Sequence, residues 1–137
     1  MRSKLMMAAV VLLPLLGGCD EGSGPSISGT ITMAPELQKT LGASDTLFVV
    51  AKDKQAGAPP VAVLRIVGMK FPMTYKLTQE DVLRPNTPFQ GEVTIQAMIR
   101  KSGAVGQSSP GDMDGAYGKP VTVGTQGVDF AIDQVRK

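Results

Sequence analysis

Short apolar stretches that alternate with polar residues, interrupted repeatedly by glycine and proline, constrain the fold of this chain more than any other feature. Its 137 residues include 16 glycines and 10 prolines. In the clearest stretch, 92–101, every second residue is apolar: Val93, Ile95, Ala97 and Ile99. A period of two is typical of a strand with one face in a core and the other wet or only partly covered. Helical patterns of useful length are absent, so the chain is predicted to form sheet.

Similar stretches elsewhere predict the remaining strands. Pro59 and Pro60 cannot donate ladder hydrogen bonds and mark a loop between two of them. Short helical turns are expected at 34–37 and at 78–81, where Thr78 can cap the turn. The predicted strands are Ile27–Met33, Thr46–Lys52, Val61–Val67, Met73–Leu77, Glu92–Lys101, Pro120–Val123 and the alternating segment 128–133. About seven short strands favour an all-β fold, an antiparallel β-sandwich of the immunoglobulin- or transthyretin-like type.

The N-terminal residues have the pattern of a secretory signal peptide. Arg2 and Lys4 precede an apolar run over 5–16, which is shorter than the roughly 20 residues that a membrane-spanning helix needs. The run ends in Leu16-Gly17-Gly18-Cys19, which matches the lipobox of bacterial lipoproteins. The alternative is an ordinary signal peptide with an incidental cysteine nearby.

Cys19 is the only cysteine of the chain, so no disulfide can form within it. A single cysteine in an exported protein calls for an explanation, and lipidation of Cys19 supplies one. We therefore expect a lipoprotein signal peptide over 1–18, a flexible tether over 19–26 and a β-sandwich domain over 27–137. The domain is expected on the periplasmic side of the cell envelope, anchored through lipid to the inner or the outer membrane.

Charge and composition exclude several classes of function. Removal of 1–18 takes Arg2 and Lys4 from the 14 basic side chains and nothing from the 12 acidic ones, so the two charges then balance. No run of Lys or Arg exceeds two residues, and nucleic acid is not an expected partner. The chain has no histidine. The usual general base and soft metal ligand are therefore missing, and we expect neither an enzyme nor a cofactor.

The most distinctive local motif is Pro110-Gly111-Asp112-Met113-Asp114-Gly115. Asp112 and Asp114 are weak candidate calcium ligands, because an EF-hand loop needs further oxygen ligands and a final bidentate glutamate. The alternative is a tight turn in which the aspartates bond their own backbone and the glycines adopt positive φ. Lys101 and Lys119 lie on either side of this motif as candidate ion-pair partners of the aspartates.

Four methionines leave a second question open: Met69, Met73, Met98 and Met113. They are interpreted either as ordinary core residues that fill gaps or as an adaptable surface for apolar peptides. Partner-binding residues are not predicted from the sequence.

Segments 26–53, 58–81, 93–118 and 128–135 resemble, in this order, the C-terminal periplasmic domain of the cytochrome c biogenesis protein CcmI, also called CycH. The similarity is carried by the TLFVVA run, the APPVAVLR run and the KSG…PGD segment. The resemblance implies a non-catalytic chaperone or assembly factor that helps to present apocytochrome c to the haem-ligation proteins. Members of that family usually have transmembrane segments and a helical repeat region before this domain, and a lipid anchor is expected in their place here.

The alternative function is a generic interaction or structural module of the cell envelope without a role in cytochrome maturation. An exposed apolar patch or an open sheet edge would be its signature.

Overall fold

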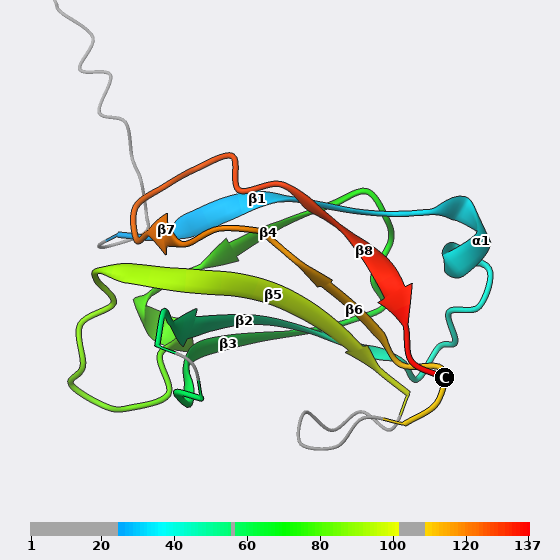
Figure 1. Ribbon diagram of the computed structural model, residues 1–137, viewed down its shortest axis with the longest axis horizontal. Coiled ribbons are helices and arrows are strands. Elements are labelled where there is room, and N and C mark those ends of the chain that lie inside the picture. Colours follow the sequence, from blue (N-terminus) through cyan, green and yellow to red (C-terminus); the bar gives the residue numbers. More distant parts are fainter. Residues whose placement is uncertain (1–24, 56, 102–108) are drawn as a thin grey trace, which may run out of the picture.

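Eight strands pair into one sheet that folds over on itself, so that two layers enclose the core (Figure 1). The structure is a computed structural model that describes residues 25–55, 57–101 and 109–137. The elements are β1 (Ile27–Met33), α1 (Pro35–Gln38), β2 (Thr46–Asp53), β3 (Pro60–Val67), β4 (Met73–Leu77), the 3₁₀ helix η1 (Gln79–Asp81), β5 (Glu92–Arg100), β6 (Met113–Ala116), β7 (Val121–Thr122) and β8 (Phe130–Val135). The predicted all-β sandwich is confirmed.

The strand order is β3-β2-β5-β6-β8-β1-β4, and β7 pairs with β5. One layer contains β2, β3 and β5, the other contains β1, β4 and β8, and β6 connects them (Figure 1). The sheet is antiparallel as predicted except in one place, where β1 pairs with β8 in parallel. The sequence pattern carries no sign of this pairing, since it joins segments from opposite ends of the domain.

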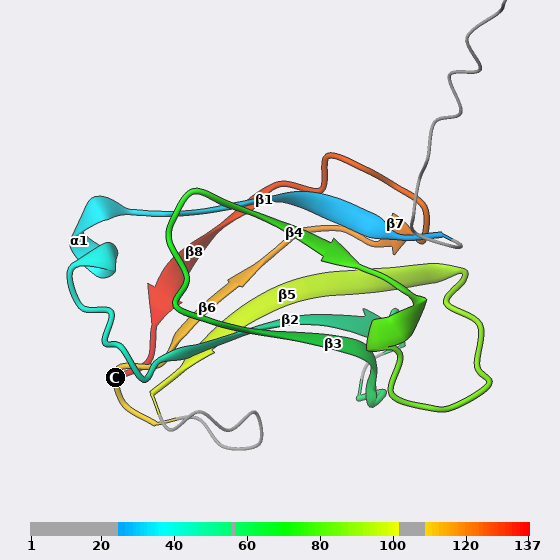
Figure 2. The ribbon, with the colours of Figure 1, turned by 180° about the vertical axis from the view of Figure 1, so that it is seen from behind.

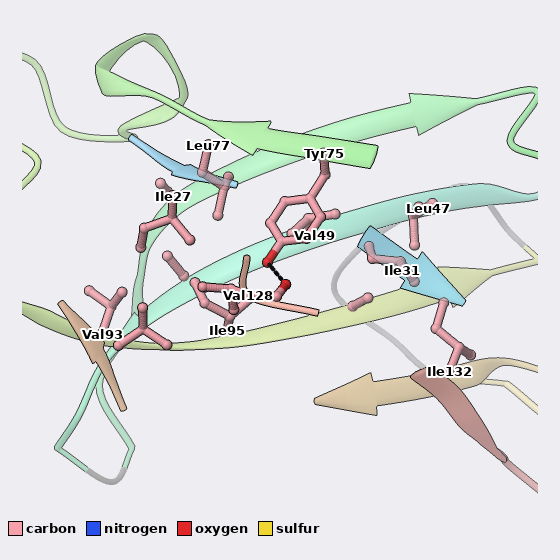
Figure 3. Packing of buried hydrophobic residues seen from close by; sticks show 14 of the residues in the cluster. Ile27, Ile31, Leu47, Val49, Tyr75, Leu77, Val93, Ile95, Val128 and Ile132 are labelled. Carbon is pink, nitrogen blue, oxygen red and sulfur yellow. Dashed lines mark hydrogen bonds between the residues drawn. The ribbon is translucent and has the colours of Figure 1, made fainter. Parts of the chain in front are cut away.

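The core lies between the two layers, as the alternating pattern predicts. In β5 the inward face is formed by buried side chains: Val93, Ile95, Ala97 and Ile99. Figure 3 shows side chains from both layers meeting there. The buried apolar cluster consists of Ile27, Ile31, Met33, Leu47, Val49, Ala51, Ala62, Tyr75, Leu77, Phe89, Val93, Ile95, Ala97, Ile99, Met113, Val121, Val128 and Ile132.

Tyr75 is the one core residue of this cluster that carries a hydroxyl group. Its ring packs edge-on against Phe130, with 6.0 Å between the ring centroids. Its hydroxyl donates a hydrogen bond of 2.7 Å to the carbonyl oxygen of Val128 (Figure 3). Burial, with a smaller contribution from the charge of Asp129, raises the pKa of Tyr75 above its ordinary value, so the phenol remains a donor. The bond fixes the segment before β8 to β4.

Strand β2 is buried on both faces, which explains its continuous apolar run. Phe48 and Val50 point away from the core, yet only 6% and 0% of their surfaces are exposed. In the sheet register, Phe48 lies between Arg65 of β3 and Met98 of β5. The long side chains of these neighbours can cover the ring.

Two short turns form as predicted. Pro35 occupies the first turn of α1, where its missing N–H costs no helical hydrogen bond. At η1 the Thr78 hydroxyl accepts from the Glu80 N–H, and the Asp81 carboxylate accepts from the Thr78 N–H at 2.8 Å. This reciprocal pair is the capping box that the sequence indicates.

The interpretation of 110–115 as a turn throughout is wrong for its second half. A turn is formed around Gly111, whose φ is +92°, but Met113 begins β6, which pairs with both β5 and β8. The strand is imposed by these neighbours, because Asp and Gly themselves disfavour strands. In addition, β8 begins at Phe130, two residues later than the alternating pattern indicates.

Candidate functional site

Charged side chains gather at the end of the sandwich where β5 and β8 end and β6 begins. This Arg100 cluster consists of Arg100, Asp112, Asp114 and Arg136. In Figure 1 this end also holds α1 and the C-terminus, whereas β1 begins at the opposite end. Neighbouring strands β5, β6 and β8 bring the four residues together.

Asp112 is fully buried and lies at the centre of the cluster. Its carboxylate accepts hydrogen bonds from the N–H groups of Lys101 at 2.9 Å and Ser109 at 2.6 Å. Burial alone would raise the pKa of Asp112, but the two N–H donors and the charges of Arg100 and Arg136 outweigh it, so the pKa lies below its ordinary value. Asp112 is therefore an ionised residue that holds the ends of the segment 101–109 together.

Arg100 is the buried cation of the cluster, with 4% of its surface exposed. Its Nη1 lies 3.1 Å from Asp114 Oδ1 and 3.9 Å from Asp112 Oδ2. Asp114 is shared, because its other oxygen accepts from Arg136 Nε at 3.0 Å. Among the described residues, Arg100 Nε has no hydrogen-bond partner. The charges are mutually compensated, as buried ion pairs require.

The side chain of Lys101 belongs to a neighbouring ion pair and does not pair with either aspartate of the motif. Its Nζ lies 2.7 Å from Asp45, which is buried, and 2.7 Å from the carbonyl oxygen of Thr40. Asp45 also accepts the Gly42 N–H at 2.8 Å. The loop before β2 is thereby attached to the end of β5.

The structure gives Asp112 and Asp114 partners that the sequence did not indicate. The sequence suggested Lys101 and Lys119, whereas both aspartates pair with arginines. Lys119 instead lies 5.8 Å from the centre of the Tyr117 ring. Over 25–55, 57–101 and 109–137, no three His, Cys, Asp or Glu residues are grouped as metal ligands. The hydrogen bond that Asp112 accepts from the nearby Ser109 N–H matches the turn interpretation of the motif at that residue.

An open groove of about 550 Å³ runs over the outer face of β5, β6 and β8 beside the cluster. Its lining combines Lys52 and Arg136 with the carboxylates of Asp114 and Asp133. With Arg100, three cations and two carboxylates line the groove, and both arginines are in ion pairs with Asp114.

The four methionines do not form one surface. Met113 is buried in the core, and Met69 and Met73 are half-buried against its edge. Met98 lies on the outer face of β5, where its sulfur is 2.9 Å from Arg100 Nη2. The interpretation as core residues fits Met113 best.

Cys19, the predicted lipidation site, lies outside the described residues, as does the segment 1–18. No helix in the described ranges is long and apolar enough to cross a membrane.

The comparison with protein families gives a match over most of the domain. Residues 27–133 match the family described as cytochrome c-type biogenesis protein H Ig-like domain. The chain belongs to this family. The matched range begins with β1 and includes most of β8, so it comprises nearly the whole sandwich.

Two individual proteins are also similar to this family member. One is an uncharacterized protein of Aquifex aeolicus (strain VF5), 26% identical over 109 residues, which are 80% of this chain and 71% of the relative. The other is an alternative pilotin from the type II secretion system of Vibrio cholerae. The structural match covers 80% of this chain and 96% of the pilotin chain, with a TM-score of 0.46 and 16% sequence identity.

Proposed function

We propose that this chain is a non-catalytic assembly factor or chaperone for c-type cytochromes, held at the periplasmic side of the envelope by lipid on Cys19. The family match over residues 27–133 carries the proposal, since it relates nearly the whole sandwich to cytochrome c-type biogenesis. The client that fits this role is apocytochrome c or a protein of haem ligation.

The chemistry of the charged end supports a binding role over catalysis. The buried carboxylate of Asp112 is held ionised by two N–H donors and two arginines. Such a group exchanges protons poorly near neutral pH, so it is unsuited to general acid–base chemistry. The chain has no histidine that could act as the general acid or base.

Deletion of the gene tests the cytochrome role. We expect haem-stained c-type cytochromes of the envelope to fall while their apoproteins accumulate, and the wild-type gene to restore them. In intact cells, a photo-crosslinker placed on this chain should capture apocytochrome c. Normal cytochrome levels without any such crosslink would favour the alternative, a generic envelope module.

The anchor is tested by the substitution Cys19→Ser. Intact-mass measurement of the chain purified from membranes should show cleavage before Cys19 and added acyl mass in the wild type. The variant should lose both, because serine lacks the thiol that carries the lipid. Gly18→Ala is the matched control, since it keeps a small residue before the cut and should be processed normally. An unacylated wild-type chain would refute the anchor.

A further inference from the structure

The outer edge of β3 is open in the part of the chain that the structure describes. On one side β3 pairs with β2 along its whole length. On the other side it meets only the segment after η1, through a single bridge between Ala62 and Val82 and a hydrogen bond of 3.0 Å from Leu83 N–H to Val61 O. From Val63 to Val67, no described strand pairs with β3 on this outer side. The unpaired peptide groups of such an edge can accept another strand.

Apolar side chains accompany this edge where the two layers of the sandwich come together. Leu64 and Ile66 of β3 pack against the core but remain half-buried. Met69 and Phe71, in the segment that leads to β4, and Met73 of β4 are in the same state. Figure 2 shows β3, this segment and β4 on the side that faces the viewer. The inward side of a strand added to β3 would therefore meet apolar neighbours.

Basic side chains also lie along the edge, and on the outward face of β3 Arg65 stands between Val63 and the exposed Val67. Arg65 in the middle of β3 and Lys70 just after it are exposed. Arg84 is also exposed, and it comes directly after Leu83, whose N–H donates to Val61. None of the three is in an ion pair with a described residue. The carboxylates on this side are Glu80, which is exposed, Asp81, which caps Thr78, and Asp53, which lines a pocket together with Arg84.

We propose that the β3 edge binds an extended segment of a partner protein in which apolar residues alternate with acidic ones. Side chains of an added strand alternate between its faces, so apolar residues would lie beside Leu64 and Ile66 and acidic ones beside Arg65. A second copy of this chain is a poor occupant, because it would bring two sets of the same cations together. The proposal rests on the binding role proposed above but not on the identity of the client.

The test uses the full chain, extracted from membranes in mild detergent, and two fluorescent seven-residue peptides. One alternates glutamate with valine, and the other has lysine in place of each glutamate. Fluorescence anisotropy should show at least tenfold tighter binding of the acidic peptide. Hydrogen exchange should slow at 63–67 when it binds. Equal binding of both peptides, or protection confined to another strand, would overturn the proposal.

The double variant Arg65→Glu with Lys70→Glu should weaken binding of the acidic peptide about tenfold, since two attractive surface pairs become repulsive. The matched control Lys119→Glu with Lys137→Glu changes the net charge equally at exposed sites that follow β6 and β8, strands not paired with β3, and should bind within about twofold of wild type. If the first variant unfolds, Arg65→Gln with Lys70→Gln gives a smaller loss in the same direction. Unchanged binding in both would refute the proposed edge.

The two proposals fail separately. If the wild-type chain fails the peptide test but its deletion lowers the level of c-type cytochromes, the edge proposal is refuted and the cytochrome role stands. Peptide binding at β3 in a chain whose deletion leaves cytochromes intact would do the reverse.

Discussion

Two glycines allow strands to approach more closely than any side chain would permit. A β-carbon at Gly29 of β1 would collide with the backbone of Val128, and one at Gly115 of β6 with the carbonyl oxygen of Ala131. In both cases the obstacle is main chain: Val128 is held by hydrogen bonds to Ser28 and Tyr75, and Ala131 lies in β8. These positions therefore require glycine for space rather than for a positive φ.

We expect Gly29→Ala to lower the free energy of unfolding by about 1–3 kcal/mol, or to prevent folding, because the added methyl group overpacks against backbone. Urea denaturation measures the change. Gly118→Ala is the control, since nothing lies within 4 Å of a β-carbon there. A Gly29→Ala protein as stable as the control would show that β1 can shift away from residue 128.

Asp112 should make the domain sensitive to acid. A carboxylate whose pKa is lowered on folding stabilises the native state above its unfolded pKa of about 3.9. That contribution is lost as the pH falls through the lower folded pKa. Asp112→Asn should cost about 1–3 kcal/mol at neutral pH, because its amide nitrogen cannot accept from an N–H.

Urea denaturation between pH 7 and pH 2 measures this dependence. The wild type should lose stability below about pH 4, and the loss should be smaller for Asp112→Asn, which has no proton to bind there. Asp133→Asn, at an exposed carboxylate, serves as the control and should follow the wild-type curve. Identical pH profiles for all three proteins would contradict the assignment.

At the scale of elements, the sequence predicts best those strands that bury their own apolar residues in the core. Alternation locates β1 and β5 because one side of each is buried by its own apolar residues. Strand β6 is not predicted from the sequence, because its residues serve contacts with other strands. Asp114 accepts a hydrogen bond from Arg100, and Gly115 leaves room for the backbone of β8. Both reasons lie in segments distant along the chain. The buried Arg100 was missed for the same reason, since nothing local indicates that an arginine ending a strand is covered.

The 3₁₀ helix η1 also organises the long segment that follows it. Gln79 donates to the Thr87 carbonyl at 2.6 Å and accepts from the Phe89 N–H at 2.7 Å. These bonds place the Phe89 ring in the core, where 1% of its surface is exposed. A polar side chain on the surface thus positions an aromatic residue ten positions later.

Gln79→Ala should lower the free energy of unfolding by about 1–2 kcal/mol through loss of the two hydrogen bonds. Hydrogen exchange at the Phe89 amide should become faster. Its neighbour provides the comparison: Glu80→Ala removes an exposed side chain and should change neither quantity measurably. Equal exchange rates at Phe89 in both variants would show that packing of the ring alone holds the segment.

At the scale of the whole molecule, the described chain begins and ends at opposite ends of the sandwich (Figure 1). The first end is fixed by a hydrogen bond of 3.0 Å from Gly124 N–H to the carbonyl oxygen of Ser26. At the other, Arg136 N–H donates to Asp112 O at 2.7 Å. A lipid on Cys19 would therefore place the start of β1 next to the membrane and the Arg100 cluster away from it.

Fluorophores on introduced cysteines test this orientation. In vesicles that carry a quencher in the lipid headgroups, a label at Gln126→Cys should be quenched more strongly than one at Lys137→Cys. Both residues are exposed, so the labels should not disturb the core. Equal quenching at the two sites would mean that the sandwich lies flat on the membrane or moves freely above it.

The parallel pairing of β1 with β8 has a consequence for biosynthesis. Among the described strands, β1 and β4 are paired with the rest of the sheet through β8 alone, so the first strand to be made is joined to the others by the last. Until then, the Val128 backbone that covers Gly29 is also missing. The sheet therefore cannot close while the chain is still being made, which would suit the export proposed above. A product truncated before residue 130 would lack the strand pairing that joins β1 and β4 to the other strands, and proteases could then remove it.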